Sequence, residues 1–343
     1  MGLGGAQRIV SELSEPSQDV YALRKAENTL GERGEKFQFP DTNSSYNLRC
    51  ILGVFSLMRQ EDYDVLHCHL KKAQIVGIVT KLFSTRDFDL IFHEHGRIFT
   101  EDPLYEKFLA KTQRYVDRYI AVSEKTKSLM QEKSDLTPDK IEVLYNFADQ
   151  KRFNPHVSDE YKREDLIHTS EDSFTLGFAG RLVQRKGWRD IINAHEFIEE
   201  DVEILIAGSG PEEDLLKESI MDKENINYLG YLEDIRTLFN EIDCFVIPSE
   251  WDPCPMISFE VQAVGIPLIC ADVPSLDELI VDGKNGLLYE SKNAGDLART
   301  VNRLKNEEGL QENLSDRELE FADSHNLHHY KENLEKIYRK QLD

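Results

Sequence analysis

The sequence has few cysteines and no long apolar run. Only 5 of its 343 residues are Cys, and none belongs to a C-x-x-C pair or to a Cys/His spacing typical of zinc sites. A disulfide framework is therefore not expected. The longest apolar stretch, 73–83, is interrupted by Lys81 and is shorter than the roughly 18–20 residues of a spanning helix; no signal-peptide core follows the N-terminus. We expect a cytoplasmic protein without a membrane span.

The chain is also poor in proline, with 11 Pro beside 19 Gly, and 40% of its residues are hydrophobic. This composition excludes collagen-like repeats and a wholly disordered chain. Since 343 residues exceed what one hydrophobic core usually serves, we expect two domains.

Negative charge is concentrated in one half of the chain. Residues 1–155 carry 22 basic and 23 acidic side chains, whereas residues 156–343 carry 19 and 41. A strongly acidic half repels nucleic acid and anionic lipid. We therefore expect no nucleic-acid partner, and we expect any membrane-bound partner to meet the first half. The alternative is that the acidity only provides solubility.

Short β-rich runs alternate with longer amphipathic stretches, which predicts βα units, parallel sheets and an α/β fold class. In the first half the expected strands are 20–23, 37–39, 65–69, 90–95, 119–122 and 141–145. In the second half they are 174–179, 202–207, 226–229, 244–247, 267–270 and 286–289. Each half thus has enough strands for its own doubly wound sheet, and the tail from Ala294 is expected to be helical.

A polar, charged stretch at 151–173 separates the two sets of strands and reads as a linker. The predicted domains are 1–155 and 156–325, and a C-terminal helix at 326–343 is expected to pack back toward the first domain. The glycine-rich turn at 2–5 enters a helix with no strand before it. We expect that the first strand of the N-terminal domain is missing here and that the natural chain begins upstream; the alternative is a sheet without that strand.

Two acids eight residues apart follow the strand expected at 244–247. Asp252 lies in a tight loop, and Glu260 lies in the helix that follows. Backbone N–H groups between them would point at a ligand from a helix N-terminus. Because carboxylates accept hydrogen bonds from sugar hydroxyls, this pattern suits a ligand with hydroxyls at both ends and phosphates between them.

Two cations follow the strand expected at 174–179. Arg181 and Lys186 lie five residues apart on a strand-to-helix loop, where they can converge on one diphosphate. Alone, such a loop is more often simply solvated, and Arg185 is expected on the surface. Beside the acid pair, the pattern favours a diphosphate site.

Histidines end two neighbouring strands of the first half, where open α/β sheets place their ligands. His67 and His69 end one strand, and His93 and His95 lie at the end of the next. We interpret His67, His69 and His93 as structural histidines, because no third metal ligand near the first two is evident. The segment 87–89 imitates a metal-binding D-x-D pattern but is interpreted as a loop.

Together these segments resemble the family 4 retaining glycosyltransferases of GT-B fold, over residues 2 to about 340. Asp252-x7-Glu260 resembles the family's E-x7-E motif, although Asp replaces the first Glu. Gly180 to Gly187 resembles its G-R-x-x-x-x-K-G segment, and Glu94 to Arg97 resembles its E-H-G-R segment. The resemblance implies two Rossmann-like domains that face each other across a cleft.

The resemblance also implies roles for the matched residues. Glu260 would hold the ribose and Asp252 the transferred sugar, Arg181 and Lys186 would neutralise the departing diphosphate, and His95 would contact the sugar or orient the acceptor. The predicted catalytic residues are His95, Arg181, Lys186 and Asp252. The predicted donor-binding residues are Gly5, Gly180, Arg181, Lys186, Gly208, Leu232, Asp252, Cys254, Met256, Ile257 and Glu260. Pro255 stands where Gly is common and has no N–H to donate, so donation falls to its neighbours.

The implied activity is a retaining, metal-independent transfer of a sugar from a UDP-, GDP- or ADP-sugar to a glycan, lipid-linked or small-molecule acceptor. No cofactor and no metal is expected, and the acceptor would bind the first domain. A sugar-nucleotide epimerase and a non-catalytic sugar-nucleotide-binding protein stay open as alternatives. Four cations between 107 and 118 recur at near-helical intervals and predict either a membrane-facing surface or a solvated face. They are Lys107, Lys111, Arg114 and Arg118.

Overall fold

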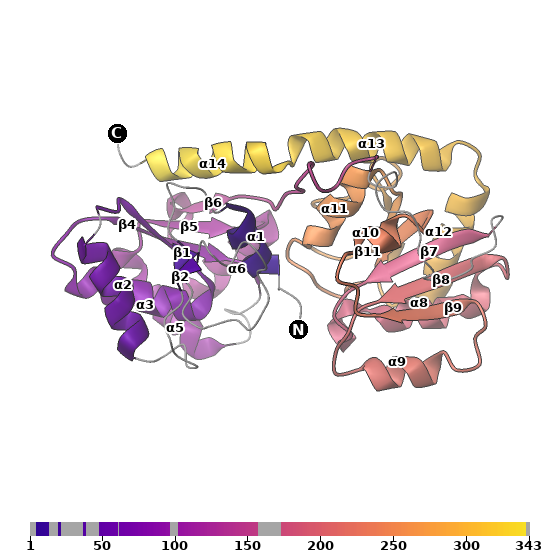
Figure 1. Ribbon diagram of the computed structural model, residues 1–343, viewed down its shortest axis with the longest axis horizontal. Helices are drawn as coiled ribbons and strands as arrows, with labels where there is room; N and C mark the ends of the chain where they lie inside the picture. Colours follow the sequence, from indigo (N-terminus) through magenta and orange to yellow (C-terminus); the bar gives the residue numbers. More distant parts are fainter. Residues whose placement is uncertain are drawn as a thin grey trace. The chain divides into compact units, whose positions relative to one another are not determined.

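The structure is a computed structural model (Figure 1), and it describes residues 5–13, 20–21, 37–38, 48–60, 62–96, 102–156 and 173–340. The chain forms two compact units. Unit 1 comprises residues 1–146 and 330–343, and unit 2 comprises residues 147–329. Among the described residues, no helix combines the length and the apolarity needed to cross a bilayer.

Unit 1 contains a parallel four-stranded sheet in the order β3-β4-β5-β6 and a separate parallel pair, β1-β2. The strands are β1 (Val20–Tyr21), β2 (Phe37–Gln38), β3 (Val65–His69), β4 (Asp89–Glu94), β5 (Arg118–Ala121) and β6 (Ile141–Val143). The helices are α1 (Gly5–Leu13), α2 (Leu48–Gln60), α3 (Leu70–Phe83), α5 (Pro103–Thr112), α6 (Glu124–Ser134) and the 3₁₀ turns η2 (Gln113–Tyr115) and η3 (Pro138–Lys140). Most residues of β4 are buried, as in a parallel sheet covered on both faces.

Capping residues determine where the helices of unit 1 begin. Asp102 accepts hydrogen bonds from the backbone N–H groups of Leu104 and Tyr105 at the start of α5. Ser123 caps α6 in the same way, which places the start of α6 directly after β5.

Unit 2 contains a parallel six-stranded sheet in the order β12-β11-β10-β7-β8-β9. The strands are β7 (Phe174–Ala179), β8 (Val202–Ala207), β9 (Ile226–Gly230), β10 (Cys244–Ile247), β11 (Leu268–Asp272) and β12 (Leu287–Glu290). The chain leaves β7 toward β8 on one side and leaves β10 toward β11 on the other. The order therefore reverses between β7 and β10, and open α/β sheets bind ligands at such a switch point.

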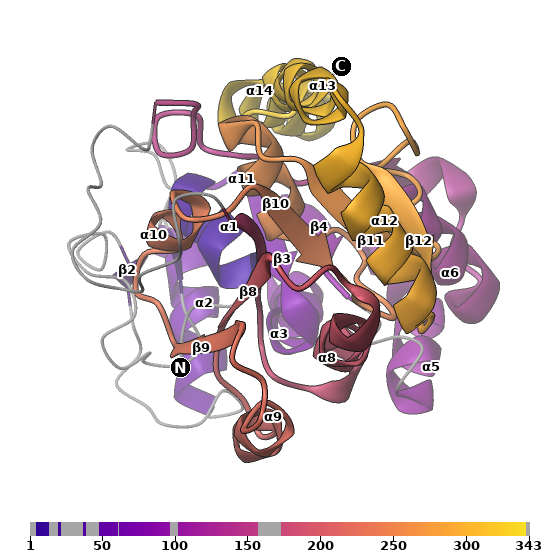
Figure 2. The same cartoon turned by 90° about the vertical axis from the view of Figure 1, so that its right-hand side faces the viewer.

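Helices flank the sheet of unit 2. They are α8 (Trp188–Ala194), α9 (Glu213–Ser219), α10 (Arg236–Phe239), α11 (Met256–Val264), α12 (Ala294–Asn306) and α13 (Leu310–Ser324), with the 3₁₀ turns η4 (Gln184–Lys186) and η5 (His195–Phe197). Helix α11 packs against α13, and α12 packs against α8 and β12 (Figure 2).

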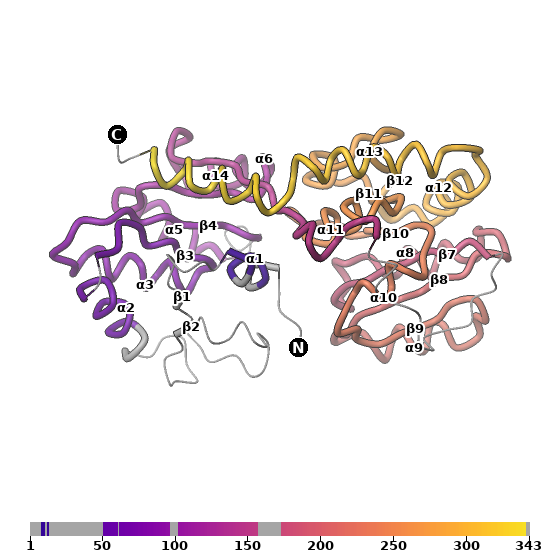
Figure 3. The backbone as a smooth tube through the Cα atoms, turned by 45° about the horizontal axis from the view of Figure 1, so that its top comes forward, coloured from indigo at the N-terminus to yellow at the C-terminus, as the bar shows by residue number. Residues whose placement is uncertain are grey.

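The last helix, α14 (Leu327–Arg339), begins in unit 2 and continues in unit 1. Its later part runs beside the strands of unit 1 (Figure 3). There the Tyr338 hydroxyl lies 2.8 Å from His67 Nδ1, and Lys340 pairs with Glu142 of β6 at 2.7 Å. These contacts attach the end of the chain to both edges of the four-stranded sheet.

Every strand expected from the sequence corresponds to an observed strand, and the ends differ by at most two residues. The α/β fold class with two parallel sheets is confirmed, and the tail after Ala294 is helical. The prediction that a strand is missing before α1 concerns residues 1–4 and what precedes them, which lie outside the described residues. Most of the expected linker, residues 157–172, lies outside them as well.

Candidate functional site

Backbone hydrogen bonds connect the loops at the carboxyl edge of the unit 2 sheet. The N–H of Leu182, after β7, donates to the carbonyl of Ser209, after β8, at 3.0 Å. The N–H of Glu250, after β10, donates to the carbonyl of Arg185 at 3.0 Å. The loop after β7 is thus attached to the loops on either side of it.

Two glycines allow these loops to approach each other closely. Gly187 has a φ of 69°, and a Cβ there would lie 1.8 Å from the carbonyl oxygen of Pro248. Gly208 has a φ of 137°, and its Cβ would lie 1.9 Å from the carbonyl oxygen of Gly180. Only glycine fits both the conformation and the space. The loop between Gly180 and Gly187 is therefore held in place by backbone packing at both of its ends.

Lys186 and Asp252 form an ion pair at the switch point. Lys186 ends the turn η4 after β7, and Asp252 lies in the loop between β10 and α11. The ammonium-bearing side chain is 21% exposed and the carboxylate-bearing one 10% exposed, so a ligand can still reach the pair. The sequence predicted a diphosphate partner for one and a sugar partner for the other, and the structure brings the two side chains into contact.

Helix α11 directs its N-terminus toward the same edge. Within the described residues, no side chain caps this helix at Pro255. The first backbone N–H groups of a helix have no intrahelical acceptor, so those of Met256 and Ile257 are available to an anion. Glu260 lies one turn further along and is 1% exposed. Arg181, directly after β7, is exposed.

The remaining predicted donor residues are divided between the units. Gly180, Gly208 and Leu232 follow β7, β8 and β9, and Cys254 is buried beside the start of α11. These four share the carboxyl edge of the sheet with the ion pair. Gly5 is the first residue of α1 and belongs to unit 1.

Two residues that the sequence analysis did not identify support this site. Ser275, buried and with a φ of 101°, donates its hydroxyl hydrogen bond to the backbone carbonyl of Asp252. Lys292, with a φ of 64°, lies 3.0 Å from the Glu250 carboxylate. A positive φ outside glycine is a conformation held by its surroundings. Neither residue belongs to a motif, so no sequence pattern indicated them.

Four histidine side chains gather on one face of the unit 1 sheet. The register of β3 and β4 places His69 opposite His93. Because alternate residues of a strand share a face, His67 and His95 join them. The ring centroids lie 4.2 Å apart for His67 and His69, and 4.1 Å apart for His93 and His95. The sequence showed no third metal ligand near His67 and His69. The structure places His93 beside them.

These imidazoles are neutral at pH 7. Burial lowers the pKa of His67, His93 and His95 well below the usual value and lowers the pKa of His69 to about 4. His69 Nδ1 and His95 Nε2 are hydrogen-bonded at 2.9 Å. The neighbouring Glu94 is buried and accepts hydrogen bonds from Gln74 and Tyr105, both at 2.9 Å. The catalytic role of His95 stays a prediction, and Arg97 of the same segment lies outside the described residues.

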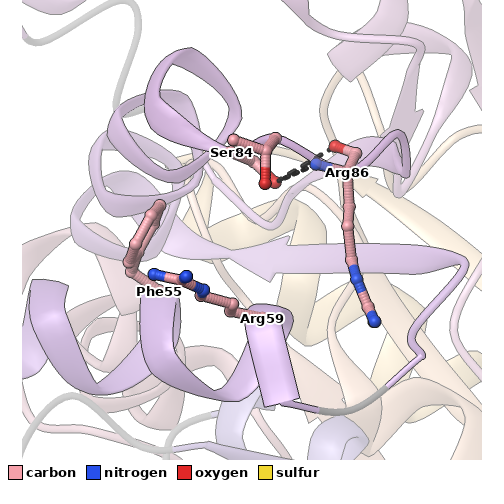
Figure 4. A pocket seen from close by; sticks show the side chains of 5 residues that line it. Phe55, Arg59, Ser84 and Arg86 are labelled. Atoms are coloured by element: carbon pink, nitrogen blue, oxygen red, sulfur yellow. Dashed lines mark hydrogen bonds between the residues drawn. The ribbon is translucent and has the colours of Figure 1, made fainter.

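A small cavity of about 90 Å³ lies elsewhere on unit 1 (Figure 4). It is lined by Phe55, Arg59, Ser84, Thr85 and Arg86. The Ser84 hydroxyl and the Arg86 backbone are hydrogen-bonded to each other at 3.1 Å, as in a turn. These residues are separate from those of the predicted sites.

Three of the four cations expected on a basic helix face are exposed. Lys107, Lys111 and Arg114 are accessible, whereas Arg118 lies 3.5 Å from the Glu142 carboxylate. Lys107 and Lys111 lie on α5, and Arg114 lies on η2.

Two family models match the chain. The Glycosyltransferase Family 4 model matches residues 4–152, and the Glycosyl transferases group 1 model matches residues 161–320. An uncharacterized glycosyltransferase of Methanocaldococcus jannaschii is 29% identical over 280 residues, 76% of this chain and 70% of the relative. The Escherichia coli UDP-Gal:alpha-D-GlcNAc-diphosphoundecaprenol alpha-1,3-galactosyltransferase is 24% identical over 260 residues, 71% of this chain and 67% of the relative.

A solved structure has the same fold. Anabaena HepE in complex with UDP-glucose superposes with a TM-score of 0.85 at 18% identity, over 97% of this chain and 95% of that one. The GT-B fold predicted from the motifs is confirmed. The chain belongs to the family 4 glycosyltransferases (glycosyl transferases group 1), which use nucleotide sugars as donors.

Proposed function

We propose that unit 2 holds a UDP-sugar and that unit 1 binds a lipid-linked or small acceptor, to which the sugar is transferred with retention of configuration. The observation that carries the proposal is the contact between Lys186 and Asp252 at the switch point of the unit 2 sheet. It joins a residue of the predicted diphosphate site to a residue of the predicted sugar site. HepE was solved with UDP-glucose, and the Escherichia coli relative is named for a UDP-galactose donor and a diphosphate-lipid acceptor.

In the proposed donor complex, the diphosphate competes with Asp252 for the Lys186 ammonium group. The phosphate oxygens also accept hydrogen bonds from the N-terminus of α11 and meet the Arg181 guanidinium. Asp252, released from Lys186, accepts a hydrogen bond from a hydroxyl of the transferred sugar. The buried Glu260 accepts hydrogen bonds from the ribose hydroxyls.

In the transfer step, the bond between the anomeric carbon and the diphosphate oxygen breaks, and its electron pair stays on that oxygen. The acceptor hydroxyl attacks from the same face, and its proton passes to the leaving phosphate. Arg181, Lys186 and the α11 amides are aimed where negative charge builds, and such preorganised donors contribute about 3–4 kcal/mol each. These groups supply the positive charge that this donor site needs, so we propose that transfer is metal-independent.

We further propose a cytoplasmic enzyme that touches the membrane through α5. Leu104 is 78% exposed at the start of this helix, and Lys107 and Lys111 follow it on the same side at helical spacing. An apolar side chain flanked by cations suits the surface of an anionic bilayer. Most of unit 1 also comes from residues 1–155, whose net charge is close to zero.

Calorimetry with UDP, GDP and ADP tests the donor assignment. We expect UDP to bind most tightly and Glu260→Gln to weaken UDP binding about tenfold or more, since hydrogen bonds to a charged group contribute about 1.5–3 kcal/mol. The control is Glu218→Gln on the exposed face of α9, which should leave UDP affinity unchanged. Equal affinity for the three nucleotides, or unchanged binding by E260Q, would contradict the assignment.

Product analysis tests transfer itself. A transferase releases UDP and extends the acceptor. An epimerase would convert the nucleotide sugar without any acceptor, and a binding protein would leave it unchanged.

A further inference from the structure

Three of the histidines of unit 1 form a cluster that has no role in the proposed sugar transfer. One ring nitrogen from each of His67, His69 and His93 lies within 4.8 Å of the others. The three rings come from two adjacent strands, at the carboxyl edge of the sheet. Their positions are fixed by the strand register, which pairs His69 directly with His93.

Several of these ring nitrogens are buried without a hydrogen-bond partner among the described residues. They are Nε2 of His67 and both nitrogens of His93, whose side chain is fully buried. Buried polar atoms are almost always satisfied, so orphaned nitrogens on two rings that lie beside a third imidazole indicate a missing ligand. Such a ligand is either a metal ion, which accepts the lone pairs of the nitrogens, or a group that donates hydrogen bonds to them.

Outer contacts orient two of the rings. Nδ1 of His67 lies 2.8 Å from the Tyr338 hydroxyl, and Nδ1 of His69 lies 2.9 Å from His95 Nε2. In metal sites the ligating histidine typically has its other nitrogen engaged in this way, which fixes the tautomer and the ring orientation. In both rings Nδ1 is the engaged nitrogen, so Nε2 is the nitrogen left for a ligand.

The donor set is chemically selective. All three groups are imidazoles, the side chains that most often bind metal ions. The nearest carboxylate on these strands, Glu94, is engaged by Gln74 and Tyr105. Imidazole ligands suit zinc, copper, cobalt and nickel, whereas magnesium and calcium require oxygen.

We propose that His67, His69 and His93 bind one divalent transition-metal ion of the zinc class, with the fourth coordination position open beside His95. Zinc–nitrogen bonds of about 2.0–2.1 Å place two tetrahedral ligands about 3.3 Å apart. The nitrogens, which lie within 4.8 Å of one another, therefore need to draw together by up to roughly 1.5 Å when the ion binds. A cation held by three neutral ligands keeps its full charge, so its open position favours water, hydroxide or an anionic oxygen ligand.

The test is a titration of the chelator-treated full chain with Co²⁺ and Zn²⁺. We expect one Co²⁺ per chain with the visible absorption bands of tetrahedral cobalt, displacement by Zn²⁺, and no competition from an excess of Mg²⁺. His67→Gln and His93→Gln keep the side-chain size and should each weaken binding at least 100-fold. Tyr338→Phe leaves all three ligands and should weaken binding about tenfold, the scale of an outer-contact loss.

The matched control is the double variant His328→Ala with His329→Ala, which removes two exposed histidines from another part of the chain. It should bind cobalt as the wild type does. Circular dichroism and thermal unfolding establish that each variant is folded, and the Tyr338→Phe result still tests the site if one glutamine variant is not. The proposal is overturned if wild-type protein shows no saturable binding, if the control abolishes it, or if both glutamine variants bind normally.

Discussion

The two units present opposite chemistry at equivalent edges of similar sheets. In unit 2 the carboxyl ends of the strands carry a lysine–aspartate ion pair, an exposed arginine and a buried glutamate. In unit 1 they carry four neutral imidazoles. Open parallel α/β sheets bind their ligands at this edge. The residues at the strand ends and in the loops after them decide whether the edge is suited to a charged diphosphate or to a ligand that binds neutral nitrogens.

The two edges are also held together differently. In unit 2, backbone packs on backbone at Gly187 and Gly208. In unit 1, the histidines are positioned by strand register and by contacts between side chains. Substituting a glycine should therefore damage the first edge, whereas the second should respond to side-chain changes.

The largest effect is expected from the charged edge. Lys186→Ala removes the cation that we place against the leaving diphosphate and should lower kcat at least about 100-fold, the scale of one lost preorganised donor. The neighbouring Arg185 is exposed, and Arg185→Ala should change kcat less than about threefold. Steady-state kinetics with a UDP-sugar measures both. Near-normal turnover by K186A would mean that the diphosphate binds elsewhere.

A pair of glycines tests how that edge is held. Gly187 and Gly230 share a φ of 69°, but a Cβ at Gly230 meets nothing within 4 Å. Gly230→Ala should cost about 1–2 kcal/mol of unfolding free energy for the left-handed conformation alone. Gly187→Ala adds a backbone collision and should cost about 1–3 kcal/mol more, together with weaker UDP binding. Thermal unfolding and calorimetry check this, and equal costs would contradict the close approach.

Buried carboxylates of the two units should differ in their pH response. Burial raises the pKa of Glu318 in unit 2, whose one oxygen accepts the Leu268 N–H at 2.8 Å while the other has no partner in the described part of the chain. Its folded-state pKa lies above the unfolded value, so stability falls as pH rises above about 4.3. Glu318→Gln removes this titration. Its free energy of unfolding should therefore exceed that of the wild type by about 1–3 kcal/mol as the pH increases.

Glu94 of unit 1 is the matched case, because two side-chain donors partly offset the burial that raises its pKa. Glu94→Gln should change the pH dependence of unfolding less than E318Q does. Urea unfolding between about pH 5 and pH 8 measures both slopes. Parallel slopes for E318Q and wild type would show that Glu318 is not the source of the pH dependence.

Helix caps should give the smallest effects. Ser123 caps α6 in unit 1 and is fully buried, whereas Asn293 caps α12 in unit 2 and is half-buried. Ser123→Ala should cost about 1–2 kcal/mol and Asn293→Ala about 0.5–1 kcal/mol. Thermal unfolding of the full chain compares them, and the reverse order would show that burial of the cap does not govern its contribution.

Much of the fold was predictable because the strands are short buried runs between turn signals. The run from Phe174 to Ala179 is a strand over the residues that the sequence indicated. The motif residues around Asp252 and Lys186 were predictable as well, because their loops directly follow such runs. The direct contact between them was not predictable, since it joins residues 66 positions apart through the order of the strands.

The histidine cluster shows the same limit. The sequence places His67 and His69 on one strand and His93 on the next, but no local pattern states the register between the two strands. A shift of one residue would turn one set to the opposite face of the sheet. The contribution of Ser275 was equally hidden, because its contact with Asp252 depends on a loop that belongs to no motif.

For this protein, the amino-acid sequence by itself determined the strands, the helical tail, the two-sheet architecture and the family. These follow from hydrophobic runs, turn residues and motif spacing, which act over a few neighbouring residues. Only the tertiary structure decided that Lys186 contacts Asp252 and that three imidazoles lie side by side. Such contacts between distant side chains depend on strand order and register, which are set by packing of the whole sheet.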